Sequence, residues 1–238
     1  MTTEIESRRL RISGLLIVDK PILLSSMGAI SRVRGRSRGV RTGHAGTLDP
    51  LATGVLVIGL GRATKQLDQL MGLDKRYQTT IDLSRTTPSF DLEMEPESVE
   101  IESIPDRAMI ERSLAGFVGE CMQAPPAFSA IKVNGKRSYT QARKQQHDDL
   151  PPRPVQVHAL EMTRFEWPEV DVEIHCGKGF YVRALARDLG RALGCGGVCT
   201  RIHRSAIGPY NDEMALHFDD IPDPIEQEHL QPVPTDGA

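Results

Sequence analysis

Hydrophobic and polar positions divide the chain into short strands and a few helices. Continuous or alternating apolar positions predict strands, which cover residues 14–20, 56–60, 76–83, 155–165 and 170–176. Apolar residues at helical spacing predict helices, which cover residues 27–33, 62–71, 103–117, 139–146 and 179–193. Strands and helices are mixed without a regular strand–helix–strand alternation, so the pattern predicts the α+β class.

Particular residues predict where these elements begin and turn. Ser25 or Ser26 is placed to cap the first helix, and Ser103 with Asp106 resembles a capping box. Gly194 ends the last helix. The dipeptide Asn134-Gly135 predicts a tight hairpin turn within AFSAIKVNGKRSY.

The same pattern suggests a central domain between two polar ends. The chain has 238 residues, of which 39% are hydrophobic, and this is enough for a sizeable core. We expect an N-terminal extension over residues 1–13, one domain over 14–210, and an acidic, frayed segment over 211–238. Residues 84–104 are acidic and contain prolines, which predicts a loop or lid outside the core.

Charge is distributed unevenly, although the net charge is only -3. Residues 1–65 carry eleven Lys or Arg and four acids, while residues 211–238 carry eight acids and no Lys or Arg. A basic region of this kind can bind polyanions even when the whole chain is near neutral. No apolar stretch approaches the roughly 20 residues of a membrane span, and the N-terminus lacks a secretory signal pattern, so we expect a cytoplasmic protein.

Four cysteines are too few for a disulfide framework in a chain of this length. Cys195, Cys199 and His203 have the spacing C-x3-C-x3-H, for which a fourth metal ligand would have to come from elsewhere, such as His175 or Cys176. Zinc sites usually pair their ligands more tightly. Buried free thiols therefore explain these cysteines better than a metal site.

The segment GHAGTLDPLATGVL places a lone carboxylate, Asp49, in a restrained bend. Gly43 and Gly46 permit unusual backbone angles, and Pro50 fixes its own φ and biases Asp49 toward extended geometry. A carboxylate presented in this way can meet a ligand with little reorganisation. An ordinary turn aspartate beside Gly and Pro is the alternative, and the local pattern alone favours it.

Two other segments combine cations with an aromatic residue. DKRY brings Tyr77 to the start of a strand, and GKGFYVRALARDLG brings Tyr181 and Arg183 to the start of a helix. An aromatic ring can stack on a base, while a cation can hold phosphate or orient a carboxylate. Each segment alone fits ordinary strand and helix surfaces, but their combination with a loop aspartate favours nucleic-acid chemistry.

Taken in order, these motifs resemble the TruB family of tRNA pseudouridine synthases. The resemblance rests on GLLIVDKP, GHAGTLDPLATGVLVIGLGRATK, DKRYQ, SAIKVNGKRSY and GKGFYVRALARDLG, and it covers residues 14–210. It implies a pseudouridine synthase fold, with a mixed, largely antiparallel central sheet flanked by helices. It also implies isomerisation of uridine-55 in the T-loop of tRNA on a flipped-out base, without a cofactor, and makes residues 14–210 the catalytic domain.

The resemblance assigns three catalytic residues. Asp49 would be the nucleophile, Tyr77 would stack on the flipped uracil, and Arg183 would pair with Asp49 and keep it ionised. The carboxylate would attack C1′, attack C6 of the ring, or stabilise an elimination, and the sequence leaves these alternatives open.

Substrate-binding roles follow from the same resemblance. Tyr181 and Ile202 would line the base pocket, and His44 would fill the gap that the flipped base leaves. The candidates for phosphate contacts are Lys20, Lys65, Lys132 and the basic residues from Arg32 to Arg41.

The sequence departs from the family pattern in one loop, at its C-terminal end, and at Phe128, which stands where tyrosine is common. In LSRTTPSFDLEMEP, where a T-D-T-x-D-x-x-G segment is usual, Ser84 and Met94 replace glycines and Pro88 replaces an aspartate. We also expect a C-terminal PUA domain, which often grips the acceptor stem, to be absent, so that RNA affinity depends on the catalytic domain.

Two other functions are compatible with parts of the sequence. A non-catalytic RNA-binding or tRNA-folding module of the same fold is one, although the intact Asp49, Tyr77 and Arg183 disfavour it. A metal-dependent hydrolase built on the cysteines is the other. No feature of the sequence demands a partner chain, so we expect a monomer.

Overall fold

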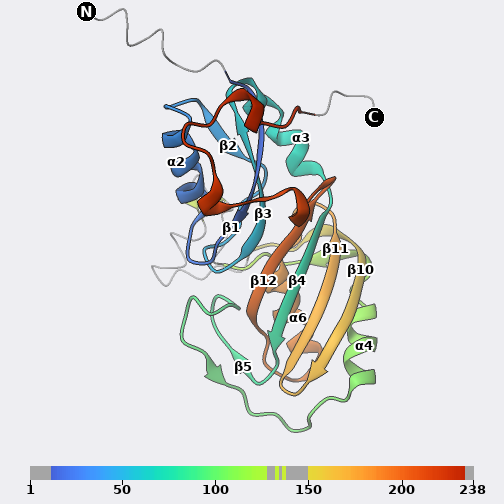
Figure 1. Cartoon of the computed structure of the whole chain (residues 1–238). Coiled ribbons are helices and arrows are strands. Elements are labelled where there is room, and N and C mark those ends of the chain that lie inside the picture. The colour runs from blue at the N-terminus through green and yellow to red at the C-terminus, as the bar shows by residue number, and fades with distance from the viewer. Residues whose placement is uncertain (1–11, 128–131, 134–135, 138–149, 234–238) are drawn as a thin grey trace, which may run out of the picture. The chain divides into compact units, whose positions relative to one another are not determined.

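The computed structural model describes residues 12–127, 132–133, 136–137 and 150–233 (Figure 1). Packing divides the chain into two compact units, one made of residues 1–73 and 204–238 and the other of residues 74–203. The catalytic domain expected over residues 14–210 stays a prediction. Among the described residues, no helix is both long enough and apolar enough to cross a membrane.

The first unit, residues 1–73 with 204–238, is built on a small sheet. Its elements are β1 (Gly14–Lys20), α2 (Ser26–Arg36), β2 (Thr42–His44), β3 (Thr53–Leu60), the 3₁₀ helix η1 (Gly61–Gln66), α3 (Leu67–Gly72), β13 (Tyr210–Asn211), η2 (Asp212–Met214), β14 (Leu216–His217), η3 (Phe218–Asp220) and η4 (Gln227–His229). Strands β14, β1 and β3 are neighbours in this order, and β2 also pairs with β3. β14 runs parallel to β1, whereas β3 is antiparallel to both β1 and β2. Apolar side chains of β1 and β3 pack with η1 and α3, which gives the unit its own core.

The second unit, residues 74–203, is built on an antiparallel sheet. Its elements are β4 (Lys75–Asp82), β5 (Arg85–Thr86), β6 (Glu97–Ser98), α4 (Arg107–Ala115), β7 (Gly119–Gln123), β8 (Lys132–Val133), β9 (Lys136–Arg137), β10 (Arg153–Glu166), β11 (Glu169–Cys176) and α6 (Val182–Leu193). Strands β4, β11, β10 and β7 follow one another in the sheet, each antiparallel to the next. The residues of β12 (Val198–Ile207) are divided between the two units.

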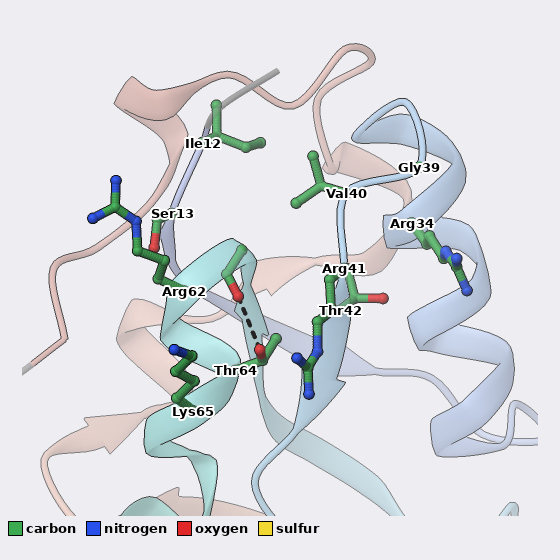
Figure 2. A pocket seen from close by; sticks show the side chains of 11 residues that line it. Ile12, Ser13, Arg34, Gly39, Val40, Arg41, Thr42, Arg62, Thr64 and Lys65 are labelled. Carbon is green, nitrogen blue, oxygen red and sulfur yellow. Dashed lines mark hydrogen bonds between the residues drawn. The ribbon is translucent and has the colours of Figure 1, made fainter. Parts of the chain in front are cut away.

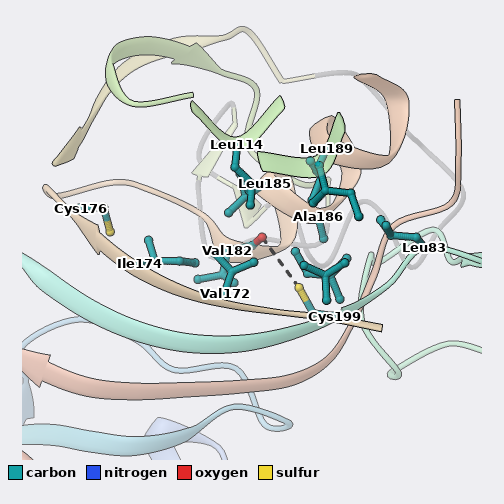
Figure 3. Close-up of a cluster of buried hydrophobic side chains, with 13 residues drawn as sticks. Leu83, Leu114, Val172, Ile174, Cys176, Val182, Leu185, Ala186, Leu189 and Cys199 are labelled. Atoms are coloured by element: carbon teal, nitrogen blue, oxygen red, sulfur yellow. Dashed lines mark hydrogen bonds between the residues drawn. The ribbon is translucent and has the colours of Figure 1, made fainter. Parts of the chain in front are cut away.

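Helix α6 supplies the core of the second unit. Its buried face contains Leu185, Ala186 and Leu189, which pack with Val172 and Ile174 of β11 (Figure 3). Helix α4 contacts both α6 and β10. The predicted α+β class, with a mixed, largely antiparallel sheet and flanking helices, is therefore confirmed.

Most predicted elements are present, with shifted ends. Ser25 caps α2 by accepting a hydrogen bond from the Gly28 N–H at 3.0 Å. Asp106, rather than Ser103, caps α4 through the Met109 N–H. The predicted helix over residues 62–71 is a 3₁₀ helix followed by the short α3, and the predicted hairpin pairs β8 with β9. The predicted turn at 134–135 and helix at 139–146 lie outside the described residues.

The acidic C-terminal segment is folded through residue 233, which corrects the expectation of a frayed end after 211. β14 pairs with β1, and the Leu15 and Gln231 backbones exchange two hydrogen bonds of 2.8 Å. Asp219 forms an ion pair with Arg32 at 3.2 Å, and the same guanidinium lies 4.8 Å from the Phe218 ring. Part of the negative charge of this segment is thus directed at the basic helix α2.

Candidate active site

Asp49 lies in a bend of the first unit that several backbone hydrogen bonds restrain. Ser26, at the start of α2, is buried, and its hydroxyl both donates to the Leu48 carbonyl at 2.9 Å and accepts from the Leu48 N–H at 2.8 Å. The Asp49 carbonyl accepts from the Ala52 N–H at 3.1 Å, and the Pro50 carbonyl accepts from the Leu23 N–H at 2.8 Å. Asp49 itself is half-buried, so the bend fixes a carboxylate that is not sealed in the core.

Buried Arg204 also supports this bend. Its side chain donates to the Val55 carbonyl at 2.9 Å and to the Gly46 carbonyl at 3.1 Å, which links the two sides of the Asp49 segment. Gly54 has a φ of 99°, and a Cβ there would lie 2.3 Å from the Arg204 carbonyl oxygen. Glycine at position 54 is therefore required both by backbone angle and by space.

Lys20 takes a different place from the one expected for a phosphate contact. It is fully buried, and its ammonium donates to the carbonyls of Pro21 at 2.8 Å, Leu24 at 2.7 Å and Pro50 at 3.4 Å. Burial lowers the pKa of Lys20 from the ordinary 10.5 to about 8, although the negative charge of Asp49 acts to raise it. Because the ammonium is already bonded and withdrawn from solvent, it does not suit phosphate binding, and its contacts support the Asp49 bend instead.

The titration of Lys20 yields a first testable prediction. Its folded-state pKa of about 8 lies below the ordinary 10.5, so between these pH values the unfolded chain binds more protons. The stability that Lys20 contributes must therefore rise with pH through this interval. Chemical denaturation gives the free energy of unfolding of wild type and of Lys20→Met. The value for wild type minus the value for Lys20→Met should increase as pH rises. Lys65→Met controls for loss of an exposed ammonium, and parallel curves for wild type and Lys20→Met would contradict the prediction.

His44, in β2, is half-buried beside the same bend. Burial, and then the charge of Arg204, lower its pKa, which favours the neutral imidazole. Its Nδ1 atom is buried and has no hydrogen-bond partner within the described part of the chain. A neutral ring can enter a base stack more readily than a charged one, and this is compatible with the predicted gap-filling role, which stays a prediction.

A basic pocket occupies another part of the first unit (Figure 2). It has a cavity volume of about 660 Å³, and the cations that line it are Arg34 of α2, Arg41, and Arg62 and Lys65 of η1. None of the described residues that line it is acidic. The Thr42 hydroxyl, also at the lining, is buried and has no hydrogen-bond partner among the described residues. The pocket thus combines concentrated positive charge with an available hydroxyl.

The structure places four arginines of the predicted basic segment from Arg32 to Arg41 in two groups. Arg32 is paired with Asp219, and Arg36 donates to the Ile221 carbonyl, so these two side chains bind the C-terminal segment. Arg34 and Arg41 instead line the basic pocket with Lys65. Of the other predicted phosphate contact, Lys132, the structure describes only the backbone, in β8.

In the second unit, Arg183 is a buried cation at the start of α6. Its Nη1 donates to the Ser89 carbonyl at 2.9 Å, and its Nε lies 3.6 Å from Oδ2 of Asp91. Asp91 is also buried, and its Oδ1 accepts from the Ser89 hydroxyl at 2.6 Å and from the Glu93 N–H at 3.0 Å. This network corrects the expectation that residues 84–104 lie wholly outside the core.

The remaining predicted residues of the second unit lie around the same core. Gln123 holds Tyr181 by two hydrogen bonds, from the Tyr181 N–H at 2.8 Å and to the Tyr181 carbonyl at 3.2 Å. Tyr77, in β4, and Ile202, in β12, are partly buried and pack against the core cluster that includes α6. Arg183, Tyr181, Tyr77 and Ile202 therefore all belong to one packed unit, while Asp49 and His44 belong to the other. The pairing of Asp49 with Arg183 stays a prediction.

Sequence motifs did not reveal several residues that support these sites. They are Ser26, Ser89, Asp91, Gln123 and Arg204, all buried polar side chains. Asp91 carried a signal, because it stands at the second aspartate of the T-D-T-x-D-x-x-G pattern. Ser26 was predicted only as a candidate helix cap, and the others carried no signal, because their contacts with Arg183, Tyr181 and the Asp49 bend join distant parts of the sequence.

The cysteines that suggested a metal site have ordinary surroundings. Burial raises the pKa of Cys195, and the Cys199 thiol lies in the core, 3.8 Å from the Val182 carbonyl (Figure 3). Within the described residues, the group of side chains with metal-ligand geometry is Asp74, His158 and His175, and it does not include Cys195, Cys199 or His203.

Two family models together match most of the chain. The TruB family pseudouridylate synthase (N terminal domain) model matches residues 34–182, and the tRNA pseudouridylate synthase B C-terminal domain model matches residues 183–233. The chain belongs to the TruB family. The second match includes the folded acidic segment, so residues 211–233 are part of a TruB-type sequence.

Relatives agree with this membership. The chain is 45% identical over 214 residues to tRNA pseudouridine synthase B of Caulobacter sp. (strain K31), covering 88% of this chain and 68% of the relative. It is 39% identical over 219 residues to tRNA pseudouridine synthase B of Parabacteroides distasonis, covering 90% of this chain and 93% of the relative.

A solved structure confirms the predicted pseudouridine synthase fold. The match is to a chain of the crystal structure of a Cbf5-Nop10-Gar1 complex, with a TM-score of 0.72 and 24% identity. It covers 96% of the TruB-family chain described here and 62% of the solved chain.

Proposed function

We propose that this TruB-family chain is a tRNA pseudouridine synthase that isomerises uridine-55 in the T-arm of tRNA. The observation that carries the proposal is the restrained bend of GHAGTLDPLATGVL, which presents the half-buried Asp49 carboxylate within a segment that matches the family model. The names of the relatives further support tRNA as the substrate.

The proposed reaction conserves atoms and electrons. The N1–C1′ glycosidic bond breaks, the uracil turns while it remains bound, and a C5–C1′ bond forms. The C5 proton is lost to solvent and N1 gains a proton, so the reaction requires neither a redox cofactor nor an energy carrier. A carboxylate suits this chemistry because it can act as a nucleophile or stabilise positive charge at the sugar.

The residues predicted to surround the reacting base have the following roles in this proposal. Asp49 supplies the carboxylate, Arg183 keeps it ionised and oriented, and Tyr77 stacks on the extruded uracil. Tyr181 and Ile202 line the base pocket. His44 takes the place of the base that has left the stack.

Loss of the C5 hydrogen provides a direct test. Transfer RNA labelled with tritium at C5 of uridine should release tritium to solvent when incubated with the protein. A matched tRNA with cytidine at position 55 should release none. Sequencing of the treated tRNA that carries uridine-55 should place pseudouridine at position 55 alone. Tight tRNA binding without tritium release would instead favour the non-catalytic RNA-folding module, and release from the cytidine-55 tRNA would refute the assignment to position 55.

The basic pocket leads to a prediction about RNA affinity. We infer that Arg41, Arg62 and Lys65 contact RNA phosphates, because they concentrate positive charge in a pocket without a described acidic side chain. Arg41→Glu combined with Arg62→Glu should weaken tRNA binding by about tenfold or more. It should also reduce the slope of log K against log salt concentration by about 0.9 for each phosphate that the variant no longer neutralises.

Filter binding over a series of salt concentrations measures both quantities. Arg38→Glu is the matched control, because Arg38 is an exposed residue of the same basic segment that does not line the pocket. If Arg38→Glu weakens binding as much per charge as the pocket variants, general charge rather than the pocket attracts RNA.

A further inference from the structure

The second unit carries a cluster of metal-ligating side chains that the proposed reaction does not use. Asp74 lies just before β4, His158 lies in β10 and His175 lies in β11. Their ligand atoms all lie within 4.8 Å of one another. Two imidazoles and one carboxylate are donors that zinc and similar divalent ions prefer.

A β-bulge explains why the two histidines meet. In the β10–β11 ladder, Val157 faces Cys176 and Ala159 faces His175, so His158 is an additional residue on β10. Val157 and Cys176 are buried, whereas His158 is exposed and His175 half-buried. The bulge therefore turns His158 to the outer face, where its ring centroid lies 4.6 Å from that of His175.

Strand register brings the carboxylate to the same place. Lys75 of β4 faces Cys176 of β11, so Asp74, which precedes β4, lies next to the end of β11. The Asp74 Oδ2 atom lies 3.2 Å from Nε2 of His158 and 3.7 Å from Nε2 of His175. A tetrahedral ion with bonds of about 2.0–2.2 Å separates its ligands by about 3.3–3.6 Å, close to both distances.

We propose that Asp74, His158 and His175 bind one divalent ion of the Zn²⁺, Co²⁺ or Ni²⁺ class, which joins the adjoining ends of β4, β10 and β11. The three side chains leave a coordination position open to solvent, since Asp74 and His158 are exposed. Cys176, although adjacent to His175, is fully buried in the core and is not a ligand. The proposal is independent of the proposed RNA chemistry.

Neighbouring charge sets the strength of the site. Burial, then the charges of Arg76 and His158, lower the pKa of His175, which favours the neutral imidazole that a metal ion needs. Arg76, which faces His175 across the β4–β11 ladder, also repels a dication. One carboxylate opposes this repulsion, so we expect binding weaker than that of a structural zinc site with four protein ligands.

Calorimetric titration of the untagged, full-length protein with Zn²⁺ tests the proposal. Wild type should bind one ion per chain, and its thermal stability should rise with the logarithm of the free Zn²⁺ concentration once that concentration exceeds the Kd. His158→Gln and His175→Gln should each lose at least about tenfold in affinity and show a correspondingly smaller thermal shift at the same Zn²⁺ concentration. His217→Gln, which removes an exposed histidine of the other unit, should behave as wild type.

Spectroscopy of the loaded protein identifies the donors. X-ray absorption at the zinc edge should show nitrogen and oxygen ligands without sulfur. Sulfur in the coordination sphere would place the ion on the cysteines and overturn the proposal. It would equally be overturned if wild type bound no zinc, or if both histidine variants bound zinc as wild type does; the three side chains would then form only hydrogen-bonded ion pairs.

Discussion

Replacement of Asp49 by asparagine should reduce pseudouridine formation by at least about 10⁴-fold while tRNA binding stays within about threefold of wild type. The substitution keeps the size of the side chain and removes its negative charge, which both nucleophilic attack and charge stabilisation require. The bend itself should persist, because Ser26, Arg204 and Lys20 all form hydrogen bonds with backbone carbonyls or N–H groups of the bend, and Asp49→Asn leaves these groups in place. Single-turnover tritium release and filter binding measure the two effects separately.

A second carboxylate of the first unit provides the control. The negative charge of Asp19, in β1, raises the pKa of Lys20 as that of Asp49 does, but by less. Asp19→Asn therefore changes the electrostatics of the same neighbourhood without touching the proposed nucleophile, and it should keep most of the activity. Normal turnover by Asp49→Asn would refute the assigned role, whereas equal losses in both variants would assign the effect to the local field around Lys20.

Apolar patterning predicted the framework of the fold well. Strands β1 and β3 are continuous apolar stretches, and β11 alternates, so burial on one or both faces is visible in the sequence. The end of α6 was predicted from the presence of Gly194, and this glycine does adopt the left-handed conformation that ends a helix, with a φ of 66°. The helix predicted over residues 62–71 was less accurate, since η1 begins without a side-chain cap and its first turns are 3₁₀.

The candidate site was harder to predict because polar residues were taken to be exposed. Lys20 was assigned to phosphate, yet three carbonyl groups bind its ammonium in the interior. The segment around Asp91 was taken for a lid, yet Ser89 and Asp91 are buried and contact Arg183. Buried polar groups are stable only with partners, and those partners are distant in sequence. Motifs identified Asp49, Tyr77 and Arg183, but the residues that hold them required coordinates.

The Asp91 carboxylate gives the second large expected effect. Asp91→Asn removes a negative charge 3.6 Å from the buried Arg183 guanidinium. Removing one partner of a buried ion pair leaves a charge with less compensation, so we expect a decrease of about 2–4 kcal/mol in the free energy of unfolding. Activity should fall by about 100-fold or more, because a guanidinium without this partner no longer keeps a fixed orientation at the start of α6.

Urea denaturation and single-turnover tritium release measure these two effects. Asp171→Asn is the matched control, since Asp171 also pairs with an arginine of the second unit, Arg164, at 2.7 Å, but that arginine is 42% exposed. An exposed pair contributes little to stability, so this variant should remain active and nearly as stable as wild type. If Asp91→Asn loses stability and retains full turnover, Asp91 supports the fold alone. If it retains both, the buried pair does not hold Arg183, and the orientation of that guanidinium must depend on the Ser89 carbonyl and on its other contacts.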